Sequence, residues 1–331
     1  MDHQIEYIDL SEVRRLYLRG TNIIDHLRRQ LGTQFNTEQL VETSYDMQAG
    51  SYVRIAEDNP DRIDPYRSEL AQLLDQFIQP GDTVADVGTG EMTTLAHVAR
   101  QGYTKVSNAY ALDISLSRLV VGKRYLRSQL DTALAEKIQP VVSSLFRLPF
   151  AANSVDVVWT SHALEPNGSR EQEAIAELAR VCRRHIVLFE PSYERNTDEG
   201  RQRMDRLGYI KDLPGAVGRI PGLTLEKVLR VEATENQLNP TFAYILRKDT
   251  AVHSQGSGLR CPLSHGSLEF KDGYLYSRNS LLAYPVIEGI PVLRVEKGIC
   301  ASILDSDDFR PRPKTEPVLT VVPSTRRERG T

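Results

Sequence analysis

Two carboxylates and two glycines stand where they could bind a ligand that carries an ammonium group and a ribose. Asp86 precedes Gly88 by two residues, and Gly90 follows Thr89. Glycines lack a Cβ and let backbone N–H groups approach a ligand closely, while the neighbouring carboxylate can hold an ammonium group. Asp113 ends the next apolar run, where a carboxylate can bind the two hydroxyls of a ribose. The third glycine of the dinucleotide fingerprint is absent, so the pattern does not favour a dinucleotide.

The segments around these residues predict the elements that position them. Short apolar runs alternate with segments of helical periodicity, a pattern typical of a sheet covered by helices. We therefore expect an α/β fold with seven strands. The expected strands are 83–87, 109–112, 139–143, 155–159, 185–190, 223–231 and 241–247, and the expected helices are 61–78, 91 onward, 115–130, 170–182 and 201–209.

The motif DVGTG (86–90), the acid in ALDIS and the LPF segment before the fourth strand resemble the class I S-adenosylmethionine-dependent methyltransferases. The resemblance covers roughly residues 40–248. It implies a mostly parallel, doubly wound, Rossmann-like sheet whose last two strands form a reversed hairpin, and S-adenosyl-L-methionine as cofactor. The cofactor contacts that it implies in this part of the chain are Asp86, Gly88, Thr89, Gly90, Asp113, Ile114, Ser144, Leu145 and Thr160. The alternative is a nucleotide-free doubly wound domain whose glycine turn serves packing.

Two positions depart from the family pattern. Met92 stands where the family often has a third glycine, so the pocket beside the methionine moiety is expected to be tighter or differently shaped. Ser144 stands where an acid often contacts the adenine amine. Because a serine hydroxyl still forms hydrogen bonds, we expect adenine binding to persist.

The candidate catalytic residues follow the fourth strand. Open α/β sheets bind ligands beyond the carboxyl ends of their strands, and the segment TSHALEPNG (160–168) lies there. His162 is the candidate general base, because an imidazole near its ordinary pKa accepts a hydroxyl proton at neutral pH. Glu165 is its candidate partner or a substrate anchor. The alternative is that His162 caps the strand or stacks on the cofactor without proton transfer.

The N-terminal residues predict helices that cover the sheet. One helix is expected from Ser11 as N-cap to a stop at Gly32, and a second follows Asn36. Tyr45, Gln48 and Tyr52 recur on the second helix at about helical spacing. The family resemblance implies that such a tyrosine-bearing helix closes over the cofactor, so these three residues are predicted cofactor contacts. The alternative is that the tyrosines are core packing.

The segment 261–293 resembles a small zinc-ribbon-like domain that serves as activator of some tRNA and protein methyltransferases. The resemblance places the four metal-ligand positions at Cys261, Ser264, Ser277 and Ser280. Three thiolates are thus missing, and we predict that no metal binds. The expected domains are an N-terminal helical cap (1–60), a methyltransferase domain (61–250), this β-rich domain (251–304) and a disordered tail (305–331).

Composition limits the remaining possibilities. The chain has 331 residues, a formal net charge of −3 and three widely spaced cysteines. The charge disfavours nucleic acid as a partner, and without a membrane span or leader we expect a cytoplasmic protein. The predicted function is O- or N-methylation of a small polar metabolite in a biosynthetic reaction, with a homo-oligomer or a protein partner through the C-terminal domain. The alternatives are an RNA or protein methyltransferase with its activator fused in cis, and a non-catalytic cofactor-binding scaffold.

Overall fold

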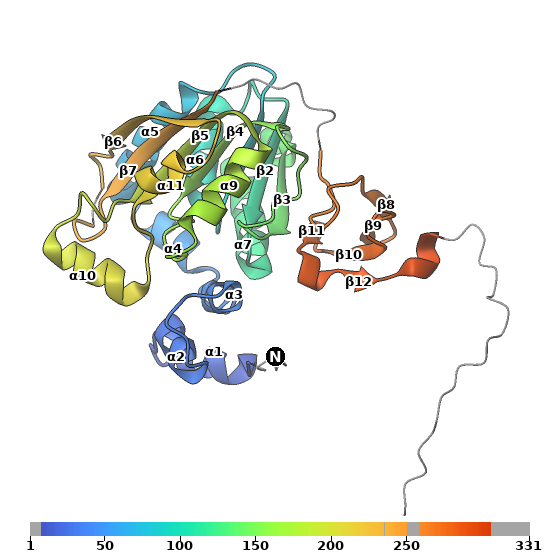
Figure 1. The fold of residues 1–331 in the computed structure, drawn as a ribbon, viewed down its shortest axis with the longest axis horizontal. Coiled ribbons are helices and arrows are strands. Elements are labelled where there is room, and N and C mark those ends of the chain that lie inside the picture. Colours follow the sequence, from blue (N-terminus) through green and yellow to red (C-terminus); the bar gives the residue numbers. More distant parts are fainter. Residues whose placement is uncertain (1–7, 235, 250–257, 306–331) are drawn as a thin grey trace, which may run out of the picture.

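The computed structural model describes residues 8–234, 236–249 and 258–305. Seven strands form the centre of its sheet in the order β3-β2-β1-β4-β5-β7-β6 (Figure 1). The pairs from β3 to β5 are parallel, and β7 runs antiparallel to both β5 and β6. This confirms the predicted α/β sheet and its reversed hairpin. The strands are Thr83–Val87 (β1), Asn108–Asp113 (β2), Ile138–Ser143 (β3), Val155–Ser161 (β4), Cys182–Pro191 (β5), Leu223–Arg230 (β6) and Thr241–Lys248 (β7).

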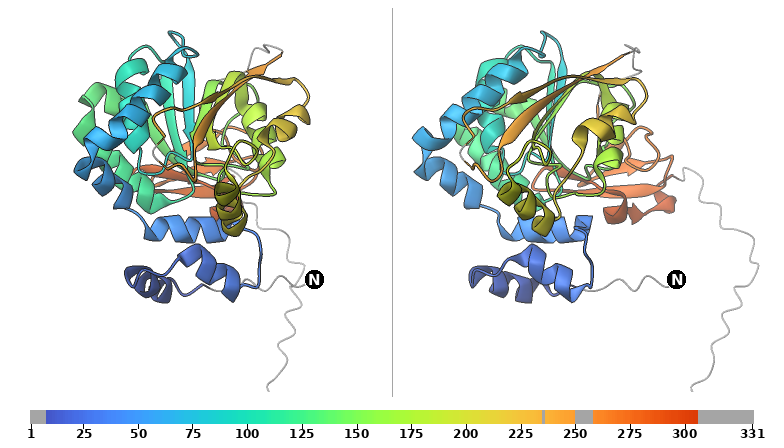
Figure 2. Two further views of the ribbon diagram at one scale, coloured as in Figure 1. Left: turned by 90° about the vertical axis from the view of Figure 1, so that its left-hand side faces the viewer. Right: turned by 60° about the vertical axis from the view of Figure 1, so that its left-hand side comes forward.

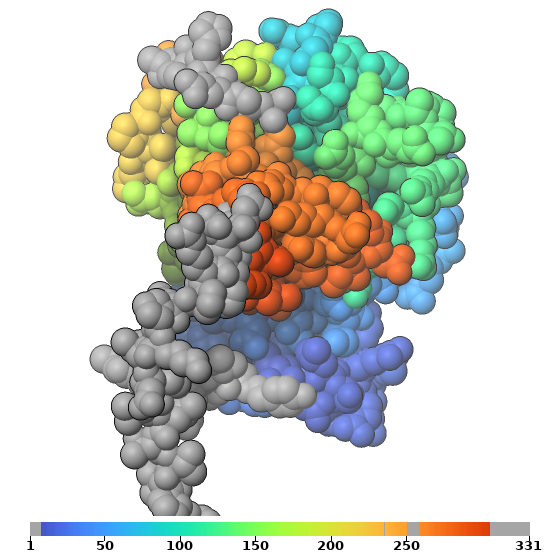
Figure 3. Space-filling model, turned by 90° about the vertical axis from the view of Figure 1, so that its right-hand side faces the viewer, coloured from blue at the N-terminus to red at the C-terminus, as the bar shows by residue number. Residues whose placement is uncertain are grey.

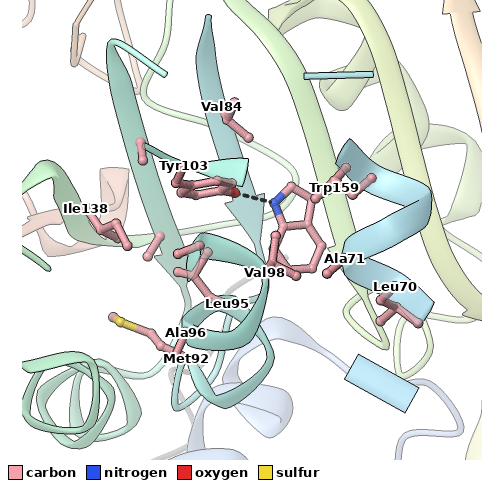
Figure 4. Close-up of a cluster of buried hydrophobic side chains, with 14 of the residues drawn as sticks. Leu70, Ala71, Val84, Met92, Leu95, Ala96, Val98, Tyr103, Ile138 and Trp159 are labelled. Atoms are coloured by element: carbon pink, nitrogen blue, oxygen red, sulfur yellow. Dashed lines mark hydrogen bonds between the residues drawn. The ribbon is translucent and has the colours of Figure 1, made fainter. Parts of the chain in front are cut away.

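Helices cover both faces of this sheet. The strands alternate between the faces, so that Val84 joins one core and Ala85 the other. Trp159 and Tyr103 lie in the first core, where Trp159 Nε1 donates to the Tyr103 hydroxyl at 2.8 Å (Figure 4). The helices over the first face are Pro60–Asp75 (α5), Thr93–Gly102 (α6), Leu116–Gln129 (α7) and Thr132–Lys137 (α8), and α9 (Glu171–Val181) and α11 (Leu213–Gly218) pack on the second, with α10 (Asp198–Leu207) beside them.

The N-terminal cap is divided more finely than the sequence predicts. The expected helix from Ser11 is two helices, Leu10–Leu18 (α1) and Ile23–Gln30 (α2), because Gly20 has a positive φ of 81° between them. Asp9, not Ser11, caps the first helix. The second expected helix is likewise broken, at Gly50 with φ 95°, into Glu38–Met47 (α3) and Ser51–Asp58 (α4). Both views in Figure 2 show α1, α2 and α3 as a layer at one end of the sheet, whereas Ala56 of α4 joins the core of the first face.

The cap is fixed across the carboxyl ends of the strands. Asp46 accepts hydrogen bonds from Ser115 and Ser117, which follow β2. Glu91, which follows β1, accepts from the backbone N–H groups of Gly50 at 3.0 Å and Val53 at 2.8 Å. These contacts place the tyrosine-bearing segment directly over the sheet edge where ligands bind.

The C-terminal strands continue the central sheet. β11 (Ile290–Leu293) pairs in parallel with the edge strand β3, and the hairpins extend outward from it in the order β10-β9-β8. Arg294 then reaches the cap helix α3, with its Nη1 2.5 Å from Glu42. Figure 3 shows this region (orange to red) against both the sheet and the N-terminal helices. The other elements here are Glu269–Lys271 (β8), Tyr274–Ser277 (β9), Leu282–Ile287 (β10), Ile299–Cys300 (β12) and the short 3₁₀ helices Val295–Lys297 and Ser302–Asp305.

The four predicted metal-ligand positions lie together in this region. Cys261 Sγ is 3.3 Å from the Ser280 hydroxyl, and Ser264 Oγ is 3.4 Å from Ser277 Oγ. Burial would raise the pKa of the Cys261 thiol, but the surrounding hydroxyls lower it to about 6. Among the described residues, no group of three or more His, Cys, Asp or Glu side chains is placed to hold a metal ion. The expected tail from 305 onward lies almost wholly outside the described residues.

We predict that this region folds without zinc. Its interior is held by hydrogen bonds among hydroxyls and one thiol, so a chelator should leave the thermal unfolding midpoint unchanged, whereas a structural zinc site would lose much of its stability. Calorimetric unfolding with and without chelator measures this. Stoichiometric zinc in protein purified without added metal would contradict the prediction.

Candidate functional site

The turn after β1 brings the backbone close to its neighbours. Gly88 has φ 80°, and a Cβ there would lie 2.1 Å from Cβ of Ala163, which follows β4. The helix α6 begins at Thr93, two residues later than predicted, because Met92 is in the left-handed conformation with φ 57°. The side chain of Met92 is buried in the core and does not line either cavity described below. The close approach of the β1 and β4 ends leaves no room for a side chain at Gly88.

A first cavity runs between the ends of β2 and β3. Its walls combine the carboxylate of Asp113 with the apolar side chains of Ile114, Leu145 and Phe146. Asp113 accepts from Gly90 N–H at 2.8 Å and Ser115 N–H at 2.9 Å, which fixes its carboxylate at the cavity edge. A carboxylate beside apolar walls suits a nucleoside, and the binding of ribose and adenine here stays a prediction. The cavity also contains residues of α3 and of the segment after β4: Glu38, Val41, Tyr45, His162, Ala163, Pro166 and Asn167.

A second cavity of about 390 Å³ opens on the other side of the glycine turn. Asp86, Gly88 and Thr89 form its base. Its walls are mostly polar and aromatic, and they come from the cap, from α5, from the end of β4 and the segment after it, and from the segment before β7. These wall residues include Tyr45, Tyr52, Tyr66, Arg67, Glu91, Arg118, Trp159, Ser161, His162, Glu165 and Asn239.

Arg118 lines both cavities. Its guanidinium carbon lies 5.2 Å from the ring centre of Tyr45 and 4.8 Å from that of Tyr52, within cation–π range. Its Nη2 would lie 2.4 Å from a Cβ at Gly90, which therefore cannot carry a side chain without moving Arg118. The buried Nε of Arg118 has no hydrogen-bond partner. A guanidinium in this place can bind the carboxylate of an amino-acid ligand.

Asp86 is a buried carboxyl group at the base of the second cavity. Burial raises its pKa to about 8, although the Thr89 hydroxyl, which donates to Asp86 at 2.6 Å, opposes the rise. The group is therefore largely protonated at pH 7. An ammonium ion bound beside it would favour the ionised form.

We predict that Asp86 releases a proton when an ammonium-bearing ligand binds. Below pH 8 the affinity for S-adenosylhomocysteine should rise with pH, by up to about tenfold per unit, because binding requires the carboxylate. Titration calorimetry at pH 7 in buffers of different ionisation enthalpy measures the released proton. Asp86→Asn should abolish the release. Binding to the unaltered protein without proton release would show that Asp86 does not meet the ammonium group.

His162 and Glu165 form a pair at the rim of the second cavity, and His162 also lines the first. His162 Nδ1 contacts Glu165 Oε2, and its Nε2 lies 2.9 Å from the Thr241 hydroxyl. Burial lowers the pKa of His162, but Tyr66 and Glu165 outweigh this and raise it to about 10. The expectation of an ordinary imidazole pKa was therefore wrong, because the residue is an imidazolium at neutral pH. Its backbone φ of 54° is also unusual for a non-glycine residue, and such strain is concentrated at functional sites.

Glu190, at the end of β5, organises this pair. Its carboxylate accepts from Thr160 Oγ1 at 2.8 Å and from the backbone N–H groups of Ala163, Leu164 and Glu165 at 3.0 to 3.1 Å. Burial raises its pKa to about 7. The hydrogen bonds hold the segment after β4 in one conformation and so place His162 at the rim.

The structure brings most of the predicted residues to the cavities. Tyr45, Tyr52 and eight others line one or both: Asp86, Gly88, Thr89, Asp113, Ile114, Leu145, His162 and Glu165. Four predicted cofactor residues do not line either cavity. The side chain of Gln48 donates a hydrogen bond to Ser44 O at the end of α3, and the hydroxyl of Thr160 donates to Glu190. The hydroxyl of Ser144 donates to Glu38, and the guanidinium of Arg118 covers Gly90.

Sequence reasoning missed several residues of this site. Glu38, Tyr66, Arg118 and Asn239 come from three helices and a loop that are far apart in the chain. Arg118 could have been predicted from its position, because it lies in the first turn of α7, which begins shortly after Asp113 and must therefore lie near that carboxylate. The others carry no local pattern.

A sequence model of the methyltransferase domain matches residues 85–189. Together with the seven-strand order, this defines a methyltransferase domain of class I, and the chain is an enzyme whose cofactor is S-adenosyl-L-methionine. Among curated proteins no sequence matches the chain. In the part of the chain that the structure describes, no helix has the length and apolar character of a membrane span.

Several solved structures are similar to this chain. A geranyl diphosphate C-methyltransferase from Streptomyces coelicolor A3(2) is 13% identical, over 55% of this chain and 76% of that one, with a TM-score of 0.43. A methyltransferase from Aquifex aeolicus is 18% identical, over 59% and 97%, with a TM-score of 0.42. The magnesium protoporphyrin IX methyltransferase of Synechocystis PCC 6803 is 18% identical, over 72% and 100%, with a TM-score of 0.41.

Proposed function

We propose that this enzyme transfers the methyl group of S-adenosylmethionine to nitrogen or oxygen of a small polar metabolite, such as a sugar or a natural-product intermediate. The observation that carries the proposal is the second cavity, which adjoins the glycine turn and holds about 390 Å³. Glu165, Asn239 and Tyr66 supply polar groups on its wall. A chamber of this size and polarity suits a small molecule with hydroxyl or amino groups.

The transfer step needs alignment above all, because the sulfonium already activates the methyl group. His162, an imidazolium at neutral pH, has no free lone pair for a proton. We assign it the role of holding Glu165, with Asn239 Nδ2 donating to the same carboxylate at 3.0 Å. This arrangement favours an acceptor atom that has a lone pair before any deprotonation, such as a neutral amine, over a hydroxyl.

A macromolecular acceptor fits these observations less well. The cavity walls come from the cap as well as from the sheet, so the acceptor must fit between the two. A non-catalytic scaffold would leave unexplained why a charged pair is held at the rim by a buried carboxylate. Recruitment of a protein partner through the C-terminal strands stays a prediction.

Two measurements test the proposal. Titration calorimetry should detect S-adenosylhomocysteine binding in the micromolar range, the usual order for enzyme ligands. Mass spectrometry of small molecules, after incubation of a metabolite extract with enzyme and methyl-labelled cofactor, should reveal a labelled product. Label found only in protein or RNA would overturn the proposed acceptor class while leaving the methyltransferase activity intact.

A further inference from the structure

The first cavity ends at a carboxylate that belongs to the N-terminal cap. Glu38, the first residue of α3, lines this cavity. Its Oε1 accepts a hydrogen bond from the hydroxyl of Ser144, and its Oε2 lies 3.9 Å from Nη1 of Arg170. The first turn of a helix favours an acidic side chain. The carboxylate is therefore held at a defined place.

The hydroxyl of Ser144 already forms hydrogen bonds within the protein. It donates to Glu38 and accepts from Phe146 N–H at 3.0 Å, and the residue does not line the cavity. A carboxylate accepts about four hydrogen bonds. Glu38 uses one of them on Ser144, which leaves acceptor positions open toward the cavity.

The remaining walls fit a flat heterocycle. Ile114, Leu145 and Phe146 are apolar, and the guanidinium carbon of Arg170 lies 3.3 Å from the centre of the Phe146 ring, which fixes that ring. Asp113 lies on the β2 side of the same cavity, placed for a ribose. A purine linked to that ribose extends toward the β3 side, where its exocyclic amine needs an acceptor.

We propose that Glu38 recognises the exocyclic amino group of the adenine of S-adenosylmethionine and that Ser144 positions its carboxylate. The inference rests on the proposed function, since it assumes that the first cavity holds the adenosine. It has a mechanical consequence. The adenine would bind the sheet and the cap at once, so that a bound cofactor ties α3 to the rest of the enzyme.

Two ligands test the assignment in titration calorimetry: S-adenosylhomocysteine and S-inosylhomocysteine, in which a carbonyl oxygen replaces the amine. A carboxylate attracts the amine and repels the oxygen. The unaltered enzyme should therefore bind the adenine ligand at least about tenfold more tightly, in keeping with hydrogen bonds to charged groups. In Glu38→Gln the preference should fall to within about threefold, because an amide can either donate or accept.

The matched control is Glu42→Gln, which lies one turn further along α3. Glu42 pairs with Arg294 and does not line either cavity. It should keep the adenine preference, and any loss of affinity should be equal for the two ligands. An equal loss for both ligands in Glu38→Gln would show that Glu38 only tethers the cap, and would overturn the proposal. Failure of the unaltered enzyme to bind either ligand would instead overturn the proposed cofactor function, and this assignment with it.

Discussion

Asp113→Ala is expected to weaken the binding of S-adenosylhomocysteine by about 10- to 150-fold. The carboxylate is placed for the ribose hydroxyls, and a hydrogen bond to a charged group contributes about 1.5 to 3 kcal/mol. The change also removes the acceptor of the Gly90 and Ser115 N–H groups, so the glycine turn keeps only its backbone hydrogen bonds from Gly88 and Thr89 to Leu112 of β2. Titration calorimetry with the unaltered enzyme and the variant measures the effect.

Asp131→Ala is the matched control for this variant. Asp131 caps α8 by accepting from Leu134 N–H at 2.9 Å and does not line either cavity. It should lose about 1 kcal/mol of unfolding free energy, as is typical of a lost N-cap, without loss of affinity. If folded Asp113→Ala retained the affinity of the unaltered enzyme, the ribose would have to bind elsewhere.

His162→Ala is expected to reduce turnover by at least ~100-fold while cofactor affinity changes by less than about threefold. Removing the imidazolium leaves the Glu165 carboxylate without its cation, and a misplacement of 1 Å at the reacting atoms can cost about 100-fold. Turnover under saturating cofactor, together with cofactor affinity from calorimetry, separates the two effects.

The pH profile distinguishes the two roles of His162. A histidine that must be charged supports activity below its pKa, so turnover should be maintained from pH 7 to 9 and fall as pH rises through about 10. A histidine that acts as base would instead give turnover rising toward pH 10. If turnover of the unaltered enzyme rose toward pH 10 and turnover of His162→Ala did not, the assignment of His162 as general base would be restored.

Backbone strain needs its own control, because His162 has φ 54°. His162→Asn places a residue that tolerates the left-handed conformation and should also be inactive. His265→Ala makes the same change at a second histidine with φ 54°, in the C-terminal region, and should keep full turnover. Activity retained in His162→Asn would indicate that strain, not chemistry, explains the loss in His162→Ala.

The central sheet follows from local sequence patterns. Each parallel strand is a short apolar run that needs burial on both faces, so its position could be predicted without the tertiary structure. The glycine turn and the acids that end β1 and β2 follow in the same way, because parallel strands bring their carboxyl ends to one edge. Asp86 and Asp113 therefore both line cavities at this edge, and their contact with the cofactor stays a prediction.

Helix breaks and distant contacts were harder to predict. Gly20 and Gly50 interrupt segments whose apolar periodicity continues across them, so the periodicity alone predicted single helices. The pairing of β11 with β3 joins segments about 150 residues apart in sequence, and nothing local to either segment specifies it.

The sequence by itself determined the class of fold, the glycine turn and the two acids beside it, because each depends on neighbours in the chain. Only the tertiary structure decided the protonation of His162, since it brings Tyr66 of α5 beside the His162–Glu165 pair, where both residues raise the pKa of His162. The same holds for Glu38, whose carboxylate meets Ser144 although 106 positions separate them. Charge and hydrogen bonding depend on distance in space, which a linear pattern does not contain.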